Sequence, residues 1–224
     1  MMKLTSTYKL HYQILFIVFA AVTTFSSCTK EQVKPQLEDG SSTVVNDLPG
    51  DVGSTINTGF KTFYFSLLTN AKVDTSAKKT TSWDLSFARE YNSYVGINSG
   101  TNEGSYGFGG TGRGAIMAVS QAYDQVKEAP SDADFVGKGV TSVGWDPGSG
   151  SGWYFYDLKT HIAVPIKGRT FVLRTADGKY AKLELVSMYK GAPAVVTDLN
   201  WPSPYFTFRY YVQQDGSRNL STKN

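Results

Sequence analysis

Hydrophobic and polar residues alternate along much of the chain with the period of two that is typical of β-strands. Aromatic and aliphatic side chains occupy every second position over residues 63–67, 83–87 and 206–212, with more polar side chains between them. Such runs turn one apolar face toward a core and one polar face toward water. The pattern therefore predicts half-buried strands over these three ranges.

A second group of strands is expected as a meander between residues 153 and 189. The expected ranges are about 153–157, 160–165, 169–175 and 179–189. The Asp177-Gly178 step between the last two ranges tolerates the positive φ angles of a tight turn. These two strands are therefore predicted to form a hairpin.

One short helix is expected over residues 117–128, where Met117, Gln121, Asp124 and Glu128 follow a helical spacing. No alternation of strands and helices is visible along the rest of the chain. The sequence therefore predicts an all-β fold, an antiparallel sandwich-like domain with one short helix and a glycine-rich loop.

The glycine-rich loop covers residues 100–114 and includes a match to G-x-G-x-x-G at residues 107–112. A dinucleotide site also requires a β-α-β unit with parallel strands around that motif, and the pattern provides none. We therefore interpret the segment as a mobile loop rather than a nucleotide site.

The first 27 residues have the order of a secretory signal peptide. Lys3 and Lys9 make the beginning basic, the nine residues Ile14–Val22 are apolar, and small and hydroxylated residues follow. A membrane-spanning helix needs about 20 apolar residues, so this run is too short to be one. Residues 1–27 are therefore expected to be removed before Cys28.

Cys28 is the single cysteine of the chain, which excludes an internal disulfide. The sequence Phe25-Ser26-Ser27-Cys28 resembles a lipobox, in which the cysteine receives a lipid anchor. We expect a lipoprotein held in the outer membrane through Cys28 and displayed on the cell surface. The alternative is an incidental free cysteine that follows a plain secretion signal.

The remaining chain divides into three predicted parts. Residues 28–52 are polar and are expected to form a flexible tether. Residues 53–215 are expected to form the β domain, and residues 216–224 a disordered tail.

Charge and chemistry exclude several functions. Without Lys3 and Lys9, 20 basic residues stand against 19 acidic ones, and no basic stripe marks a nucleic-acid surface. His161 is the only histidine outside the predicted signal peptide, residues 1–27, so neither a histidine-based zinc cluster nor a Cys–His pair is available. A Ser–His–Asp triad would lack its nucleophile elbow. The sequence therefore predicts a binding protein rather than an enzyme.

Four segments together resemble the HmuY family of lipid-anchored haem-binding proteins, which are all-β and pass haem to a transporter. The similarity covers most of residues 55–215. The segments that carry it are Thr81-Ser82-Trp83-Asp84-Leu85-Ser86-Phe87, residues 153–162, the run Arg174-Thr175-Ala176-Asp177-Gly178-Lys179-Tyr180-Ala181-Lys182-Leu183, and Tyr205-Phe206-Thr207-Phe208-Arg209-Tyr210.

The resemblance implies that haem or a related tetrapyrrole is bound for uptake, with an outer-membrane haem transporter as partner. It also implies an iron held by two axial side chains, histidines in the founding member and methionines in some relatives. His161 is then one candidate ligand, and Met117 the other, brought to the iron by closure of the loop over residues 100–114. Met188 is interpreted as a packing residue. Four tyrosines flank the same region and are candidates for stacking on or ligating a porphyrin: Tyr91, Tyr94, Tyr106 and Tyr123.

Other interpretations of these residues stay open. His161 is alternatively a structural strand histidine bonded to a neighbouring carbonyl, and Met117 a core residue on a helix face. A different function is the binding of glycans or other small ligands without haem, and another is a purely structural or adhesive module. Five aromatic residues are candidates for stacking on sugar rings: Trp145, Trp153, Tyr154, Tyr156 and Trp201.

Replacing the candidate lipidation residue tests the anchor. We expect Cys28→Ser to leave the domain folded but to move the protein from the membrane fraction to the soluble fraction, because the acyl chains supply the membrane affinity. Fractionation followed by immunoblotting measures this. Cys28→Ser protein that still sediments with membranes would contradict the prediction.

Overall fold

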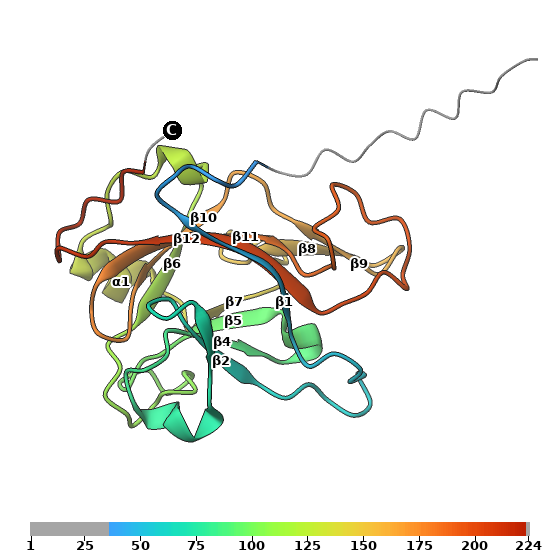
Figure 1. Cartoon of the computed structure of the whole chain (residues 1–224), viewed down its shortest axis with the longest axis horizontal. Helices are drawn as coiled ribbons and strands as arrows, with labels where there is room; N and C mark the ends of the chain where they lie inside the picture. Colours follow the sequence, from blue (N-terminus) through green and yellow to red (C-terminus); the bar gives the residue numbers. More distant parts are fainter. Residues whose placement is uncertain (1–35, 223–224) are drawn as a thin grey trace, which may run out of the picture. The chain divides into compact units, whose positions relative to one another are not determined.

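The computed structural model describes residues 36–222, so Cys28 and the predicted signal peptide lie outside the described residues. Two five-stranded antiparallel sheets face each other as a sandwich (Figure 1). The first sheet has the order β1-β12-β11-β10-β6. Its strands are β1 (Thr43–Pro49), β6 (Ala115–Val119), β10 (Thr170–Arg174), β11 (Tyr180–Ser187) and β12 (Tyr205–Val212).

The second sheet has the order β3-β2-β4-β5-β7, and a separate hairpin pairs β8 with β9. These strands are β2 (Phe63–Ser66), β3 (Ala71–Val73), β4 (Leu85–Ala88), β5 (Tyr94–Ile97), β7 (Ser142–Val143), β8 (Tyr154–Asp157) and β9 (Ile162–Pro165). The helical elements are α1 (Asp132–Lys138) and the 3-10 turns η1 (Thr75–Lys79), η2 (Glu90–Asn92) and η3 (Tyr123–Gln125). Over residues 36–222, no helix is long and apolar enough to cross a membrane.

Aromatic side chains from both sheets meet in the core. Phe87 of β4 lies 4.8 Å from Phe206 and 5.9 Å from Phe208 between ring centroids, and Phe65 of β2 lies 5.4 Å from Phe208. All four are almost fully buried, as the sequence predicted for the apolar positions of these strands. The intervening positions of β4 and most of β12 are buried as well, so the expectation that the other face of these strands points toward water is wrong. The all-β, sandwich-like prediction is confirmed.

The segment between residues 153 and 189 forms two hairpins rather than one meander. β8 pairs with β9, while β10 pairs with β11 inside the first sheet. The predicted turn at Asp177-Gly178 is confirmed, since Gly178 has a φ of +93° and its N–H donates to the carbonyl of Thr175 over 2.9 Å. The strands were therefore predicted correctly, and their assignment to a single sheet was wrong.

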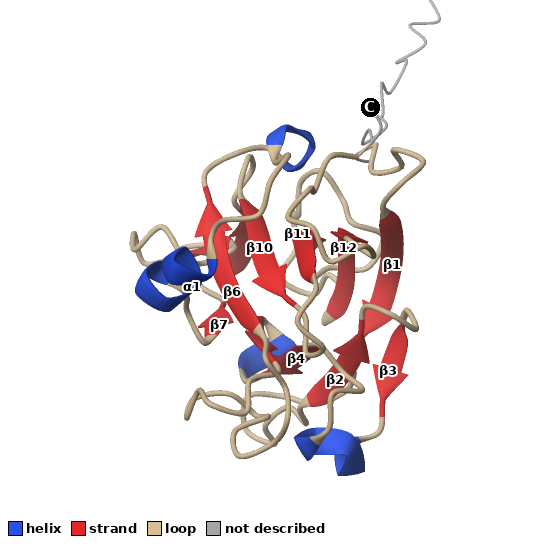
Figure 2. Cartoon of the chain, turned by 90° about the vertical axis from the view of Figure 1, so that its left-hand side faces the viewer, coloured by secondary structure: helices blue, strands red, loops and turns tan. Residues whose placement is uncertain are grey.

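The helix predicted over residues 117–128 is wrong. Residues 115–119 are strand β6, and the short helix α1 begins later, where Ser131 and Asp134 form a capping box. Ile116 is buried in the main core and Met117 in a second apolar cluster beneath Phe135 of α1. Because α1 covers the outer face of β6 (Figure 2), the strand is apolar on both faces and lacks the alternation that would have identified it.

Two predicted boundaries are also wrong, because the described parts of both predicted terminal segments belong to the domain. Residues 43–49 of the predicted tether form β1, which pairs with β12. In the predicted tail, the side chain of Leu220 is fully buried and its N–H donates to the carbonyl of Lys127 over 2.8 Å. The ordered domain therefore extends beyond residues 53–215 at both ends.

Two cations hold these terminal segments on the outer face of the first sheet. Lys182 Nζ, completely buried, donates to the carbonyls of Tyr123 and Val126 over 3.1 Å each and to Thr222 Oγ1 over 3.2 Å. Arg209 donates to the carbonyl of Leu37 over 3.2 Å and stacks on the Tyr123 ring from 4.2 Å. Both ends of the domain are thus fixed around the Tyr123 ring.

Truncation of Trp83 tests the core. The indole is 0% exposed, stacks on Tyr64 at 4.3 Å and donates to the carbonyl of Lys78 over 3.2 Å. We expect Trp83→Ala to lower the free energy of unfolding by about 3–5 kcal/mol, measured by urea denaturation. The matched control is Trp145→Ala, because that indole is 43% exposed. A loss below about 1 kcal/mol for Trp83→Ala would contradict this burial.

Lys182 gives stability a pH dependence. Burial lowers the pKa of Lys182 from 10.5 to about 8. Between these values the unfolded chain binds more protons than the folded one, so the free energy of unfolding should rise from pH 8 to pH 10.5, by up to ~3 kcal/mol. The measurement compares wild type with Lys182→Met at each pH, which removes the contribution of other titrating groups. A difference between the two proteins that is constant with pH would contradict the prediction.

Candidate functional site

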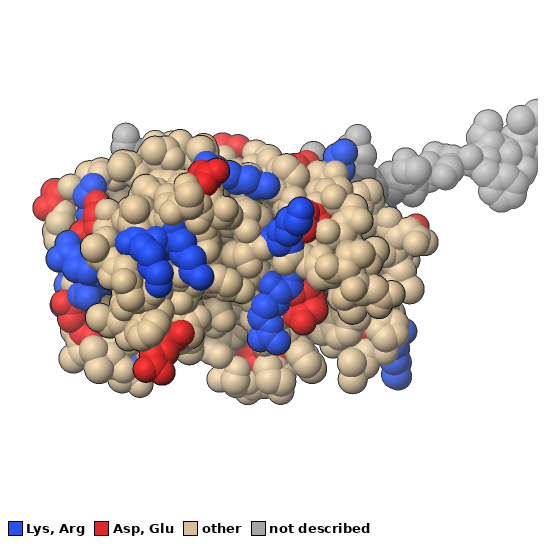
Figure 3. Space-filling model, turned by 90° about the horizontal axis from the view of Figure 1, so that it is seen from below, with Lys and Arg blue, Asp and Glu red and all other residues tan. Residues whose placement is uncertain are grey.

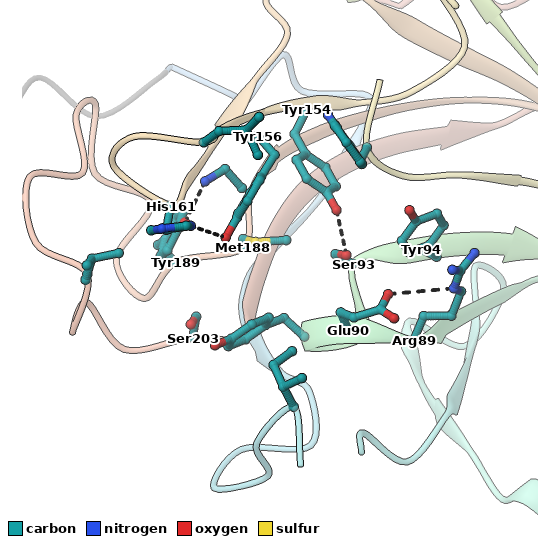
Figure 4. A pocket seen from close by; sticks show the side chains of 16 residues that line it. Arg89, Glu90, Ser93, Tyr94, Tyr154, Tyr156, His161, Met188, Tyr189 and Ser203 are labelled. Atoms are coloured by element: carbon teal, nitrogen blue, oxygen red, sulfur yellow. Dashed lines mark hydrogen bonds and ion pairs between the residues drawn. The ribbon is translucent and has the colours of Figure 1, made fainter. Parts of the chain in front are cut away.

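A cavity of about 500 Å³ opens beside the β8–β9 hairpin. Its walls come from this hairpin, the turn between β4 and β5, the end of β11 and the loops near Ile56, Trp145 and Leu199 (Figure 4). Most of the lining is aromatic or aliphatic, and among the described residues that line the cavity the only ionisable ones apart from tyrosines are Arg89, Glu90 and His161. Volume and composition are those of a small-molecule site.

The hairpin turn carries His161 to the cavity. The carboxylate of Asp157 accepts from the backbone N–H of Lys159 over 2.8 Å, and the N–H of His161 donates to the carbonyl of Asp157 over 2.7 Å. This tight turn holds His161 in the left-handed region, at a φ of +56°. Its Nδ1 lies 3.1 Å from Tyr156 Oη, so Tyr156 fixes the plane of the imidazole.

Buried tyrosines form the rigid wall behind the imidazole. Tyr154 Oη lies 2.9 Å from Ser93 Oγ, and Tyr189 Oη accepts from the backbone N–H of Ala163 over 2.9 Å. Burial raises the pKa of Tyr154 to about 12 and also raises the pKa of Tyr189. Both phenols therefore stay neutral at physiological pH.

The opposite wall is the turn over residues 89–93, which joins β4 to β5. Arg89, Tyr91 and Asn92 have φ angles of +60°, +52° and +53°. The fully buried Asn92 amide holds this turn, because it donates to the carbonyls of Lys61 and Phe87 and accepts from the N–H of Asp51. The turn places the Arg89 guanidinium over the Tyr94 ring, 4.2 Å from its centroid.

The two methionines do not lie where the sequence interpretation placed them. Met117 is buried in the cluster under α1 and does not line the cavity, so its proposed pairing with His161 is not supported. Met188, interpreted as a packing residue, lines the cavity together with His161. Figure 4 shows its thioether between His161 and Ser93. Met188 follows the end of β11, and the sequence carries no signal for that placement.

The glycine-rich loop does not cover this cavity. Its backbone is bonded to itself and to its surroundings, for example from Gly100 N–H to the Gly112 carbonyl over 2.8 Å and from Thr111 N–H to the Lys79 carbonyl over 3.1 Å. Gly104, Ser105 and Tyr106 line a second cavity of about 200 Å³ on the outer face of the second sheet. The expectation of a mobile loop closing over His161 therefore finds no support in this arrangement.

The candidate aromatic residues separate into two groups. Tyr91, Tyr94, Tyr154, Tyr156 and Trp145 line the larger cavity, with Trp145 edge-on to Tyr156 at 6.3 Å. Those that do not line it are Tyr106 in the smaller cavity, Tyr123 beneath the terminal segments, the buried Trp153, and Trp201, which is packed against the core.

The charges of the domain are dispersed. On the face drawn in Figure 3, lysines and arginines lie among aspartates and glutamates with no broad area of one sign. Among residues 36–222, no group of three histidine, cysteine, aspartate or glutamate side chains could hold a metal ion. The larger cavity has one imidazole, one thioether, Arg89 and Glu90 among mostly aromatic and aliphatic walls.

Fold and cavity thus define a β-sandwich domain with a cavity of small-molecule size. The sequence model of the HmuY protein family matches residues 60–203, and the chain belongs to that family. No curated protein matches the sequence significantly.

Solved structures with a similar chain trace include an apo HmuY analog of Tannerella forsythia, with 14% identity, 83% of this chain and 98% of that chain covered, and a TM-score of 0.44. Apo PinO of Porphyromonas gingivitis has 10% identity over 77% of this chain and 96% of its own, with a TM-score of 0.44. A candidate HmuY-like heme-binding protein of Bacteroides vulgatus has 12% identity over 80% of this chain and 94% of its own, with a TM-score of 0.39.

Proposed function

We propose that this protein binds haem or a related tetrapyrrole in the cavity beside the β8–β9 hairpin, for uptake and without catalysis. The observation that carries the proposal is the placement of the single histidine outside the leader, His161, in an aromatic-walled cavity of about 500 Å³. Membership of the HmuY family supports the same ligand class.

His161 fits the role of an axial iron ligand. When Nδ1–H donates to Tyr156 Oη, the other ring nitrogen, Nε2, keeps a lone pair that is free to bind iron. Such a hydrogen bond to the second nitrogen orients a metal-binding imidazole and raises its basicity. The exposed position of His161 at the hairpin tip leaves the ring accessible to a ligand.

Met188 is the best second ligand among the residues that line the cavity. A thioether is a soft ligand that binds haem iron without losing a proton. Tyr154 and Tyr189 would have to ionise from pKa values that burial has raised. The pair His161–Met188 replaces the pair His161–Met117 expected from the sequence, and it should raise the reduction potential relative to two histidines.

The proposed setting of this domain is the cell surface. Lipidation of Cys28 would anchor the protein in the outer membrane, and the segment between Cys28 and the first described residues would link the anchor to the domain. An outer-membrane haem transporter would then be the partner that receives the ligand. This part of the proposal is supported by the sequence order of residues 1–28.

A second candidate function is the binding of a glycan without haem. Trp145, 43% exposed, and Tyr156 offer flat apolar surfaces at the cavity mouth on which a sugar ring could stack. This function needs neither His161 nor Met188. Haemin titration therefore distinguishes the two.

Titration with haemin tests the proposed site. We expect wild type to give a shifted, sharpened Soret band of six-coordinate iron. His161→Ala should weaken binding at least ~10-fold and abolish that spectrum, because a coordinate bond is lost. Met188→Leu should retain haem through His161 in a five-coordinate form.

Met117→Leu is the matched control for Met188→Leu. Both changes conserve volume at a buried methionine, but Met117 lies outside the cavity. The control should bind haemin as wild type does. An unchanged spectrum and affinity in His161→Ala would exclude His161 as a ligand, and a wild type with no haemin binding would favour the glycan alternative.

A further inference from the structure

The turn over residues 89–93 separates the two cavities, and Arg89 and Tyr94 line both of them. Arg89 is the only lysine or arginine among the described residues that line either cavity. Its ion pair with Glu90 is long, 3.7 Å, with more than half of each side chain exposed. Such a pair holds the guanidinium weakly and leaves its donors available to a ligand.

The backbone of Arg89 is strained. Its φ of +60° and ψ of −155° fall in a region that is essentially restricted to glycine. The bonds of Asn92 to the carbonyl of Phe87 and to the loop near Asp51 impose this geometry. Glycine would adopt this backbone without strain, so an arginine here indicates that its side chain has a use.

The smaller cavity provides hydroxyl groups next to this cation. Ser86 of β4 is 1% exposed, lines the smaller cavity, and has no hydrogen-bond partner for its Oγ within residues 36–222. Its cross-strand neighbour Gly96 leaves room for that hydroxyl, because a Cβ there would lie 2.7 Å from Ser86 Oγ. Thr141 and Ser142 line the same space.

We infer that Arg89, together with Ser86 in the adjoining smaller cavity, forms a carboxylate subsite for an anionic side chain that extends past the turn from the ligand in the larger cavity. This inference rests on the proposed function and names the feature of the tetrapyrrole that is recognised. Figure 4 shows Arg89 and Tyr94 on the opposite side of the cavity from His161. A planar ligand held at His161 would therefore extend its edge toward Arg89, where the guanidinium donates two hydrogen bonds to a carboxylate.

The test compares haemin with haemin dimethyl ester, whose carboxylates are blocked, in fluorescence-quenching and Soret titrations. We expect wild type to bind haemin ~10-fold or more tightly than the ester, as for a charge-assisted hydrogen bond. In Arg89→Met the affinities for haemin and for the ester should agree within about twofold, because the variant loses affinity for haemin and not for the ester. Arg89→Lys should retain part of the preference for haemin, because lysine keeps the positive charge but lacks the two parallel N–H donors of the guanidinium.

Two further variants separate binding from folding. Arg89→Gly should lose the carboxylate preference while its melting temperature is unchanged or raised, since glycine relieves the strained backbone. Ser86→Ala should lower the preference several-fold without lowering the melting temperature, because the hydroxyl has no partner to lose. Lys127→Met, which removes an exposed cation outside both cavities, should leave both affinities unchanged.

Iron-free protoporphyrin and its dimethyl ester complete the test, because they lack the bond to His161. The same preference for free carboxylates should persist in this pair. Equal wild-type affinities for haemin and its ester, or an unchanged ratio in Arg89→Met, would overturn the carboxylate subsite while haem binding stands. No binding of either haemin form would overturn the subsite and the proposed function together.

Discussion

The buried side chain of Asn92 is the constraint on which the binding cavity depends. Asn92 itself is 0% exposed, and its amide holds together the end of β4, the loop near Asp51 and the backbone of Lys61. An unpaired amide at this depth would cost about 1–3 kcal/mol per group, so the three bonds fix the turn over residues 89–93 in one conformation. Arg89, Tyr91 and Ser93 reach the cavity only because this turn is rigid.

The second wall is fixed to the first by hydrogen bonds between buried groups. Ser93, at the end of the turn, accepts through its carbonyl from Trp153 Nε1 over 2.7 Å and contacts Tyr154 Oη through its hydroxyl. The β8–β9 hairpin belongs to neither large sheet, so these bonds and the packing of Trp153 into the core position it. The location of His161 therefore follows from contacts made beneath the cavity rather than from the hairpin alone.

The sequence predicts those elements whose stabilisation is local. Alternation identified β2, β4 and β12, and the Asp177-Gly178 step identified the β10–β11 turn, because each signal comes from neighbouring residues. Alternation could not identify β1, in which Val45 is the only buried residue and which is held by pairing with β12. His161 was singled out as the only histidine of residues 28–224, and the structure places it at the cavity, while its role as an iron ligand stays a prediction. Met188 was missed, since a methionine beside a core strand gives no signal that distinguishes packing from lining a site.

The glycine-rich loop and the turn over residues 89–93 differ in the distribution of their backbone strain. The glycine-rich loop has glycines where chains approach closely: a Cβ at Gly107 or Gly112 would lie 2.2–2.3 Å from Asn98 Oδ1. Around the larger cavity Arg89, Tyr91 and His161 keep side chains at positive φ, and so does the buried Asn92 behind the turn. Each such residue costs up to about 1–3 kcal/mol, most for Arg89 and least for asparagine and histidine, which tolerate this region better. Arg89, Tyr91 and His161 line the cavity, so the strain that they bear supports the proposed role of their side chains in ligand recognition, whereas Asn92 holds the turn in place.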